Sequence, residues 1–430
     1  MKKILIRAGV SPVGEYSTNE IINNNLIGNN VGNLLFPFSI SRALMKPDVE
    51  INNLIFSKRV LEHQIDRINN EYDALIIPLA NAFRRSNVRG LNIMTRCIRK
   101  IKIPCIVVGV GAQAPINGEI EDPILNKATK KFVKAVLKKS DSIGLRGEFT
   151  ADYLQKLGFT PEKDFTVTGC PSMYLYGDTL PEMRLKELTA ESKVSMNSKV
   201  QLPQKFHDFM ERSAKLLPNH HYVPQVIEEI RMMYNALPFP DGFTNTIPTI
   251  FPASYDASVY QQGKGITFVN VPSWLNYLKE KDFSFGSRIH GNIAAILAGT
   301  PCFIVVSDAR IKELVDYHHI PHIMMDDLTS STNIMDLYEK ADYSAIKKGH
   351  KANFDHYLDF LHKNGLDTIY DNGSVEGKTP FDKKVESLKL ASRVEPYVSV
   401  SKLEQMNRKM KQSSLIMSYY KGKQRKGTVK

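Results

Sequence analysis

The chain has 430 residues, which at about 150 residues per domain is enough for two or three domains. Hydrophobic residues make up 42% of it and charged residues 24%, a composition that excludes a largely disordered or fibrous protein. No run of about 18 apolar residues occurs, so we expect no membrane-spanning helix. Four scattered cysteines form no C-x-x-C pair, which argues against a disulfide framework or a zinc site and favours the cytoplasm: Cys97, Cys105, Cys170 and Cys302.

The positive charge is concentrated near the C-terminus. The chain has 57 Lys and Arg against 45 Asp and Glu, a net charge of +12. Residues 402–430 contain nine of the basic residues and one acidic residue, and so account for +8 of the surplus. An excess of this kind is typical of proteins that bind nucleic acids, anionic membranes or anionic substrates. Because most of it lies in one terminal segment, the rest of the chain gives no strong indication of a polyanionic partner.

Apolar runs and amphipathic stretches alternate through the first part of the chain. The runs 4–6, 74–78, 105–110, 142–145 and 165–168 predict strands, and the stretches 91–101, 125–139 and 150–157 predict helices between them. Continuous apolar strands separated by helices are typical of a parallel sheet covered on both faces. We therefore predict an α/β domain over residues 1–180.

A second alternating series follows a polar linker. Strands are expected at 194–197, 221–226, 266–270, 282–285 and 302–306, and helices at 204–217, 274–280 and 292–298, which predicts a second α/β domain over residues 190–342. The proline-rich stretch 237–265 is expected to be a long loop. Residues 343–420 are expected to form a helical extension, with helices near 346–361 and 381–390, and residues 421–430 a basic flexible tail.

Two such domains bind ligands in the crevice beyond the carboxyl ends of their strands. The segment Gly286-Ser287-Arg288-Ile289-His290-Gly291 follows a predicted strand and precedes a predicted helix. The spacing of Arg288 and His290 puts both on one side of an extended segment, and Gly291 permits a turn into the helix. A cation, an imidazole and a helix N-terminus then converge, which suits an anionic substrate. The alternative is that both side chains are structural.

A second arginine lies at a similar turn, in Gly144-Leu145-Arg146-Gly147-Glu148. A guanidinium there could bind a phosphate or a carboxylate; alternatively, it forms a salt bridge with Glu148 or across the domains. The strand exit Gly109-Val110-Gly111-Ala112-Gln113 would point Gln113 into the crevice, although a tight turn explains it equally well. It is not a G-x-G-x-x-G motif, so no dinucleotide cofactor is inferred.

Two clusters of polar residues are harder to interpret. The loop Ile27-Gly28-Asn29-Asn30-Val31-Gly32-Asn33 could present amides to a sugar, or Asn33 could cap the helix that follows. The histidines His318, His319 and His322 flank Ile320-Pro321 in an expected loop that offers no fixed geometry. We therefore predict no metal site.

These motifs, in this order, resemble the polysaccharide pyruvyl transferase family over residues 28–342. The segment 287–291, followed by Ala298-Gly299-Thr300-Pro301, is similar to that family's R-x-H-G…G-x-P segment. The segment 146–150, followed by Leu154 and Leu157-Gly158, is similar to its R-x-E-x-(S/T)…L…LG segment, and the exits at 109–113 and 28–33 resemble its two glycine-rich loops. Two departures affect the acceptor side: Asn33 stands where the family usually has Asp, and Pro78-Leu79-Ala80-Asn81 replaces a glycine pair.

The resemblance implies two Rossmann-like domains in a GT-B-like arrangement. It also implies transfer of pyruvate from phosphoenolpyruvate, a substrate and not a cofactor, to two hydroxyls of a sugar as a ketal. The acceptor would be a sugar of a cell-surface polysaccharide such as a capsule or exopolysaccharide, often lipid-linked, at the cytoplasmic face of the membrane. The N-terminal domain would then bind the acceptor and the C-terminal domain the donor.

Candidate residues follow from the motifs and the resemblance together. His290 would be the acid/base, since its ordinary pKa near 6.5 suits proton transfer, with Arg288 beside it. Glu148 would act as an acid or base, or would orient Arg146. The expected donor-binding residues are Arg146, Arg288, His290, Gly291, Ser287 and Gln113, and the expected acceptor-binding residues are Asn29, Asn33 and Asn81.

Three alternatives stay open at this level. A GT-B glycosyltransferase that uses a nucleotide sugar would suit the same fold. A nucleic-acid-binding protein would use the basic tail, but the tail has no RNA-binding motif and few aromatic residues. The tail could instead contact an anionic membrane, with Leu403, Met406, Met410 and Met417 on one helical face, or form a helix packed on the enzyme.

Overall fold

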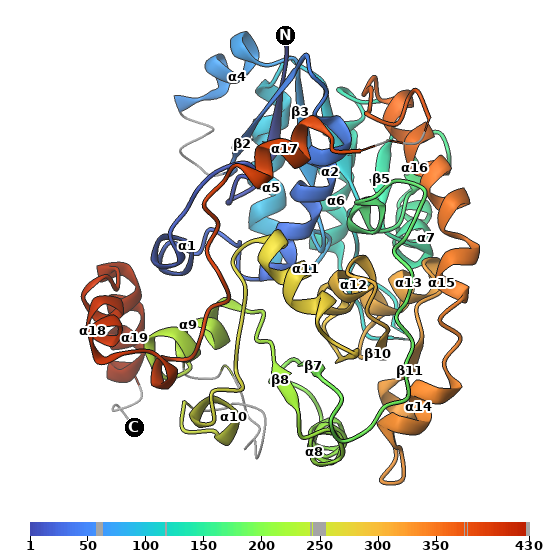
Figure 1. The fold of residues 1–430 in the computed structure, drawn as a ribbon. Helices are drawn as coiled ribbons and strands as arrows, with labels where there is room; N and C mark the ends of the chain where they lie inside the picture. The colour runs from blue at the N-terminus through green and yellow to red at the C-terminus, as the bar shows by residue number, and fades with distance from the viewer. Residues whose placement is uncertain are drawn as a thin grey trace.

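The computed structural model describes residues 1–56, 63–116, 118–240, 243, 255–373, 375 and 377–426. Two α/β domains face each other, and the last helices lie along one side of the molecule (Figure 1). The predicted strand at 221–226 is shorter and begins earlier than expected, and much of the loop 237–265 lies outside the described residues. Within the described part of the chain, no helix is long and apolar enough to cross a bilayer.

The first sheet is parallel and has the order β2-β1-β3-β4. Its strands are β1 (Lys2–Arg7), β2 (Val49–Leu54), β3 (Ala74–Pro78) and β4 (Cys105–Val108). A parallel pair, β5 (Ile143–Leu145) and β6 (Phe165–Val167), continues it through a bridge between Val110 and Leu145. The strand β2 was not predicted, because its sequence VEINNL is largely polar, as an edge position permits.

Helices cover both faces of this sheet. They are α1 (Thr18–Asn23), α2 (Leu35–Leu44), α4 (Ile65–Glu71), α5 (Val88–Lys100), α6 (Pro123–Val136) and α7 (Glu148–Lys156). Successive side chains of a strand point to opposite faces, and here both sets are buried. In β3, for example, Ile76 belongs to one hydrophobic cluster, and Leu75 and Ile77 belong to the other. This double burial explains the continuous apolar runs in the sequence.

The second sheet is also parallel, with the order β11-β10-β9-β7-β8. Its strands are β7 (Val194–Asn197), β8 (His220–Tyr222), β9 (Phe283–Gly286), β10 (Cys302–Val306) and β11 (His322–Met324). Its helices are α8 (Gln204–Leu216), α9 (Ile227–Asn235), α10 (Ser258–Gln261), α11 (Val271–Lys279), α12 (Ile289–Leu297), α13 (Ala309–Tyr317) and α14 (Ile334–Lys340). The two parallel sheets confirm the predicted pair of Rossmann-like domains in a GT-B-like fold.

Several predicted elements are wrong in detail. The strand expected at 266–270 is two isolated bridges, at Gly265 and Thr267, because the segment runs along β8 and residue 394 without continuous pairing. The helix α12 begins at Ile289, three residues earlier than expected, so His290 lies in its first turn and not in an extended segment. The strand β11 was not predicted at all, and it contains His322.

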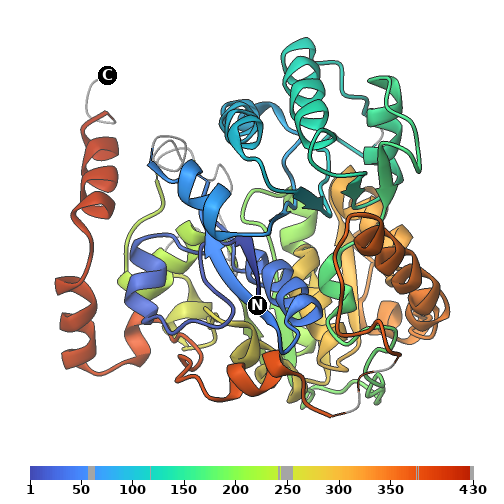
Figure 2. The same ribbon diagram turned by 90° about the horizontal axis from the view of Figure 1, so that it is seen from above.

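The C-terminal region returns to the first domain and then to the second. Its helices are α15 (Ala345–Lys348), α16 (His350–Lys363), α17 (Pro380–Glu386), α18 (Lys402–Met410) and α19 (Ser414–Lys426). On α16, the Tyr357 ring stacks on Tyr174 of the first domain at 4.8 Å. Viewed from above, α18 and α19 stand at the edge of the molecule (Figure 2). The helix α19 extends to Lys426, into the segment expected to be a flexible tail, and residues 427–430 lie outside the described residues.

Candidate functional site

A cavity of about 720 Å³ lies between the two domains, where the carboxyl ends of both parallel sheets meet. Six cationic side chains line it, and its described lining contains no aspartate or glutamate: Arg7, Arg84, Arg146, Lys199, Arg288 and Arg310. Four of these, Arg7, Arg146, Lys199 and Arg288, end a strand or follow one within two residues, as expected for a crevice at the strand ends. The lining of the cavity therefore carries an excess of positive charge, which suits a small polyanion.

Arg288 is held at the end of β9 by contacts on three sides. Its backbone N–H donates to Asn197 Oδ1 at 2.8 Å, and its Nε donates to the Ser198 carbonyl at 2.8 Å. Its second terminal nitrogen lies 3.5 Å from the buried carboxylate of Glu229. Burial raises the pKa of Glu229, and the charge of Arg288 opposes that rise. The last two contacts hold the guanidinium at the cavity wall.

One carboxylate positions two further cations that the sequence analysis missed. Asp308 accepts hydrogen bonds from Lys199 Nζ at 2.8 Å and from Arg310 at 3.0 and 2.7 Å. Burial would raise the pKa of Asp308, but Lys199 and Arg310 hold it well below its ordinary value. Burial in turn lowers the pKa of Lys199 to about 8. The result is a preorganised pair of cations at the ends of β7 and β10.

Arg146 enters the cavity from the first domain. It is 3% exposed, and within the described structure its Nε hydrogen has no acceptor. Its nearest carboxylate is Glu313 of α13 at 3.9 Å, and Glu313 also accepts hydrogen bonds from the backbone and hydroxyl of Thr150. A Cβ at Gly111 would lie 2.3 Å from Arg146 Cδ, so only glycine fits there. The glycine-rich strand exit thus makes room for this arginine.

His290 lies where the two domains meet. Its ring packs edge-on against Phe36 with the ring centroids 4.6 Å apart, and its Nε2 lies 3.8 Å from Cys170 Sγ. A Cβ at Gly32 would lie 2.7 Å from His290 Cβ, so the second glycine of the N-terminal loop permits this approach. Burial, with the charges of Arg146 and Arg310, lowers the pKa of His290 to about 3. The imidazole is therefore neutral near pH 7, whereas a histidine with the ordinary pKa near 6.5 would be partly protonated there.

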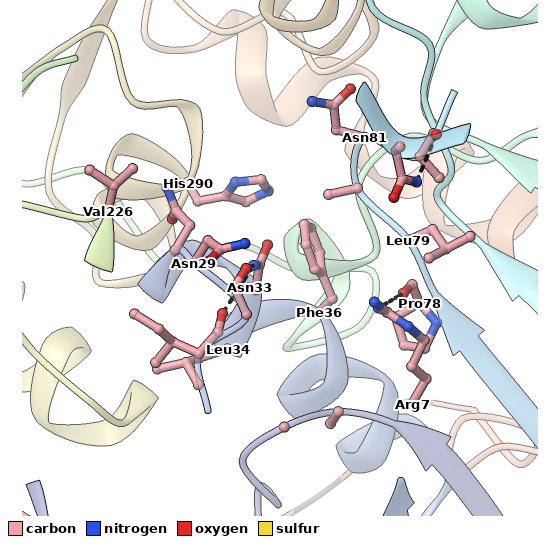
Figure 3. Close-up of a pocket in the computed structure, with 18 of the residues that line it drawn as sticks. Arg7, Asn29, Asn33, Leu34, Phe36, Pro78, Leu79, Asn81, Val226 and His290 are labelled. Carbon is pink, nitrogen blue, oxygen red and sulfur yellow. Dashed lines mark hydrogen bonds between the residues drawn. The ribbon is translucent and has the colours of Figure 1, made fainter. Parts of the chain in front are cut away.

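The wall formed by the first domain is rich in amides. Figure 3 shows His290, Asn29 and Asn33 on one side of Phe36, and Arg7, Pro78 and Leu79 on the other. Asn29 is exposed and has a left-handed backbone, with φ of 74°. Asn33 does not cap the next helix: its Nδ2 donates to the carbonyls of Ile27 and Gly28 at 3.1 and 2.9 Å, so it stabilises the loop.

Other predicted residues differ in how they contribute. Gln113 lines the cavity and its side chain hydrogen-bonds with Asn81 at 3.0 Å. Ser287 lines the cavity, and its Oγ accepts a hydrogen bond from the backbone of Lys199 at 3.1 Å. Gly291 does not line it; a Cβ there would lie 2.3 Å from Gln225 Nε2, so it permits close packing behind the site.

Two interpretations need correction. Glu148 is exposed and does not line the cavity, and within the described structure no contact joins it to Arg146; Glu313, from the other domain, is the carboxylate nearest to Arg146. The histidine cluster is structural at its best-defined position, because His318 Nε2 accepts the backbone N–H of Cys170 at 2.9 Å. Burial lowers the pKa of His318 to about 3. Within the described ranges, no group of three or more His, Cys, Asp or Glu could hold a metal ion.

Three of the four missed cations share one signal; the fourth, Arg84, follows β3 by six residues. Arg7 ends β1, Lys199 follows β7 by two residues, and Arg310 follows β10 by four. Each adjoins a strand that the sequence predicts, but none belongs to a recognisable motif. A search for every basic residue just after a predicted strand would have found all three.

The fold and this cavity define a two-domain, GT-B-like protein with an anion site between its domains. A family model described as polysaccharide pyruvyl transferase matches residues 30–308. The chain belongs to the polysaccharide pyruvyl transferase family, which is a family of transferases.

Other comparisons are more distant. No curated protein matches the chain. Among solved structures, it is similar to the UDP-GlcNAc 2-epimerase of Methanocaldococcus jannaschii, with 10% identity and a TM-score of 0.43 over 84% of this chain and 99% of that one. It is also similar to a putative UDP-N-acetylglucosamine 2-epimerase of Listeria monocytogenes, with 12% identity and a TM-score of 0.40 over 85% and 94%. A third is the S. aureus MnaA-UDP structure, with 11% identity and a TM-score of 0.39 over 85% and 100%. At these values, no ligand or activity carries over to this chain.

Proposed function

We propose that this protein transfers pyruvate from phosphoenolpyruvate to two hydroxyls of a sugar, forming a ketal. The observation that carries the proposal is the cavity itself, which combines six cationic side chains with a described lining free of carboxylates. Phosphoenolpyruvate has a phosphate and a carboxylate on a three-carbon unit, so it needs several converging cations. The family to which the chain belongs supports the same donor.

The donor fits best against the C-terminal wall. Arg288 and Arg310 can each form two parallel hydrogen bonds with a phosphate or carboxylate, and Lys199 adds a point charge. Arg146 reaches the same space from the opposite domain, with its Nε hydrogen unused in the described structure. Four cations fixed by neighbouring groups can bind the donor without reorganising, which is the main advantage of a preorganised site.

The atoms and charges of the proposed transfer balance without a resident cofactor or metal. Protonation of the vinyl carbon gives a methyl group and an oxocarbenium-like central carbon. One sugar hydroxyl attacks that carbon and loses its proton; the bond to the phosphate oxygen then breaks, and phosphate leaves with the bonding pair. The second hydroxyl closes the ketal. The two hydroxyls release two protons in total. One makes up for the proton added to the vinyl carbon, and the other is carried away by the phosphate. A trianionic donor therefore gives a monoanionic ketal and HPO₄²⁻.

His290 is suited to move these protons. As a neutral imidazole it can accept the proton of an attacking hydroxyl. The depressed pKa reflects burial beside Arg146 and Arg310, so a bound trianion that neutralises those charges would raise the pKa again. The imidazolium formed during the reaction would then lie beside the departing phosphate. Glu148, being exposed and outside the cavity, has no part in this scheme.

The wall of the first domain is suited to the acceptor. Asn29, Asn81 and Gln113 present amides, which hydrogen-bond sugar hydroxyls, and Phe36 and Leu79 present apolar surfaces to a sugar ring. The volume of about 720 Å³ exceeds what phosphoenolpyruvate alone would fill. We assign the acceptor to a cell-surface polysaccharide or its lipid-linked precursor, built on the cytoplasmic side of the membrane.

The test is to incubate the protein with phosphoenolpyruvate and a panel of nucleotide-linked and lipid-linked saccharides. Phosphate release, with the mass of one pyruvyl group added to an acceptor, supports the proposal. Release of a nucleoside diphosphate from a nucleotide sugar, without use of phosphoenolpyruvate, would show instead that the protein is a glycosyltransferase.

A further inference from the structure

The helix α18 differs from an ordinary surface helix, because two of its polar side chains, Arg408 and Gln405, face the protein while its apolar side chains do not. Arg408 is 5% exposed and donates to the carbonyls of Tyr234 at 3.2 Å and Glu395 at 3.0 Å. Its guanidinium also lies 4.0 Å from the centre of the Tyr234 ring. Gln405 donates to the carbonyl of Tyr397 at 2.9 Å. These contacts fix which side of the helix faces outward.

The outward side of α18 is apolar. Leu403 is 69% exposed, Met406 59% and Met410 71%. At about 100° per residue, these three side chains lie within an arc of about 60°. In the next helix, Leu415 is 79% exposed, so residues 403–415 contain four of the nine exposed large hydrophobic residues in the described part of the chain. Such clustering marks an interaction surface, whereas single exposed apolar residues are ordinary.

Positive charge borders this stripe. Lys402 and Lys409 are exposed and project, at about 100° per residue, on the Met406 side of the stripe, about 40° and about 60° from Met406. The one acidic residue, Glu404, forms a 3.0 Å ion pair with the buried Arg408, which offsets its charge. The segment 402–430 has a net charge of +8. Near the stripe, the exposed basic residues Lys402, Lys409 and Lys411 outnumber the one acidic residue, so two copies of this surface would repel each other, which disfavours self-association through it.

We propose that the outer face of α18, which we call the α18 stripe (Leu403, Met406 and Met410), binds the surface of an anionic lipid bilayer. The apolar side chains would enter the boundary between headgroups and acyl chains, and the lysines would contact anionic headgroups. The earlier expectation placed Met417 on the same face, but α18 ends at Met410, and Met417 lies on α19.

The position of the α18 stripe would place the cavity close to the membrane. The stripe is anchored to α9 through Tyr234, and Val226, just before α9, lines the cavity. The distance along α9 between these residues is about 12 Å, at about 1.5 Å per residue. Docking through the stripe would therefore hold the cavity near the bilayer, where a lipid-linked saccharide would be found. The membrane proposal itself does not depend on the proposed reaction.

The experiment is vesicle co-sedimentation of the full chain, with no substrate present. We expect at least tenfold stronger binding to vesicles of phosphatidylglycerol and phosphatidylcholine than to phosphatidylcholine alone, and weaker binding at high salt. The variant Leu403→Ser/Met406→Ser/Met410→Ser should lose at least tenfold in binding. Its matched control, Ile124→Ser/Leu185→Ser/Leu216→Ser, changes three exposed apolar residues elsewhere and should bind like the wild type.

A second variant tests the charge separately. Lys402→Gln/Lys409→Gln should weaken binding to anionic vesicles and reduce its salt dependence. Thermal unfolding checks that each variant is folded, which is expected because all the changed side chains are exposed. Absence of wild-type binding to anionic vesicles, or equal binding by the Leu403 triple variant, would overturn the proposal. So would a vesicle-free dimer, seen by analytical ultracentrifugation, that this variant abolishes, because the stripe would then be a self-association surface.

Discussion

The two walls of the cavity hold their cations in different ways. On the C-terminal wall, Arg288 lies against Glu229, and Lys199 and Arg310 share Asp308. On the N-terminal wall, Arg7 contacts the carbonyl of Pro78 at 3.3 Å and, within the described residues, forms no ion pair. Its pKa is lowered by burial.

This difference indicates how one cavity can bind two different substrates. Cations fixed by carboxylates form a rigid array that suits a small ligand of constant shape, such as phosphoenolpyruvate. Amides and apolar surfaces, with Arg7 and Arg84 held by neutral oxygen atoms, suit a larger ligand with many hydroxyls. Arg146 joins the walls, because it comes from the first domain but lies beside Glu313 of the second.

Of the substitutions considered, Arg288→Ala should have the largest effect on the donor side of the cavity. Removing a preorganised donor typically lowers the rate about 10²–10³-fold, and we expect a loss in kcat/KM for phosphoenolpyruvate at the upper end of that range. The matched control is Arg67→Ala on α4, whose partner Glu71 is also exposed. Near-normal turnover in a folded Arg288→Ala variant would refute the assignment of the donor site.

Asp308→Asn should loosen two cations together. Asparagine can still cap α13, where the Asp308 side chain accepts from Ile311 N, so the helix should be preserved. We expect the KM for phosphoenolpyruvate to rise about tenfold, equivalent to about 1.4 kcal/mol. The control is Asp316→Asn, an exposed residue of the same helix that pairs with Lys312. If both variants behave alike, Asp308 does not organise the donor site.

Arg7→Ala tests the other wall. Because Arg7 belongs to the wall of the first domain, beside Pro78 and Leu79, we expect the KM for the acceptor to rise several-fold while the KM for phosphoenolpyruvate changes little (Figure 3). Steady-state kinetics with each substrate varied in turn provides the measurement. If the KM for phosphoenolpyruvate changes more than the KM for the acceptor, the roles assigned to the two walls must be exchanged.

The pH dependence of the free energy of unfolding tests the environment of His290, which lies where the two walls meet. His290 has a pKa of about 3 in the folded protein, below the ordinary value near 6.5 in the unfolded chain. Between these values the unfolded state binds more protons, so stability falls as the pH falls below 6.5, by about 1.4 kcal/mol per unit for one proton. His290→Gln removes this contribution. Urea unfolding at pH 7 and pH 5 should show a smaller loss of stability for the variant than for the wild type; an equal loss would mean that His290 is not buried as a neutral imidazole.

The parts of the site that the sequence reveals are local ones. Arg288, His290 and Arg146 were predicted because each sits in a short motif at the end of a strand. Arg7, Lys199 and Arg310 occupy equivalent positions but have no motif around them. Glu313 could not be found in this way, because its contact with Thr150 joins residues 163 positions apart.

The elements of the fold, like the site residues, were predicted only where the local sequence carries a signal. The parallel sheets were predicted because both of their faces are buried, which produces continuous apolar runs. The edge strand β2 was missed because its polar sequence gives no such signal. The spacing of Leu403, Met406 and Met410 was visible in the sequence, but only the contacts of Arg408 and Gln405 show that this face points outward.

Calorimetric titration with phosphoenolpyruvate tests the central claim most directly, because it needs no acceptor. We predict one binding site per chain, competition by inorganic phosphate, and loss of binding in Arg288→Ala but not in Arg67→Ala. Failure of the wild-type protein to bind phosphoenolpyruvate, together with binding of a nucleotide sugar that depends on Arg288, would contradict the account.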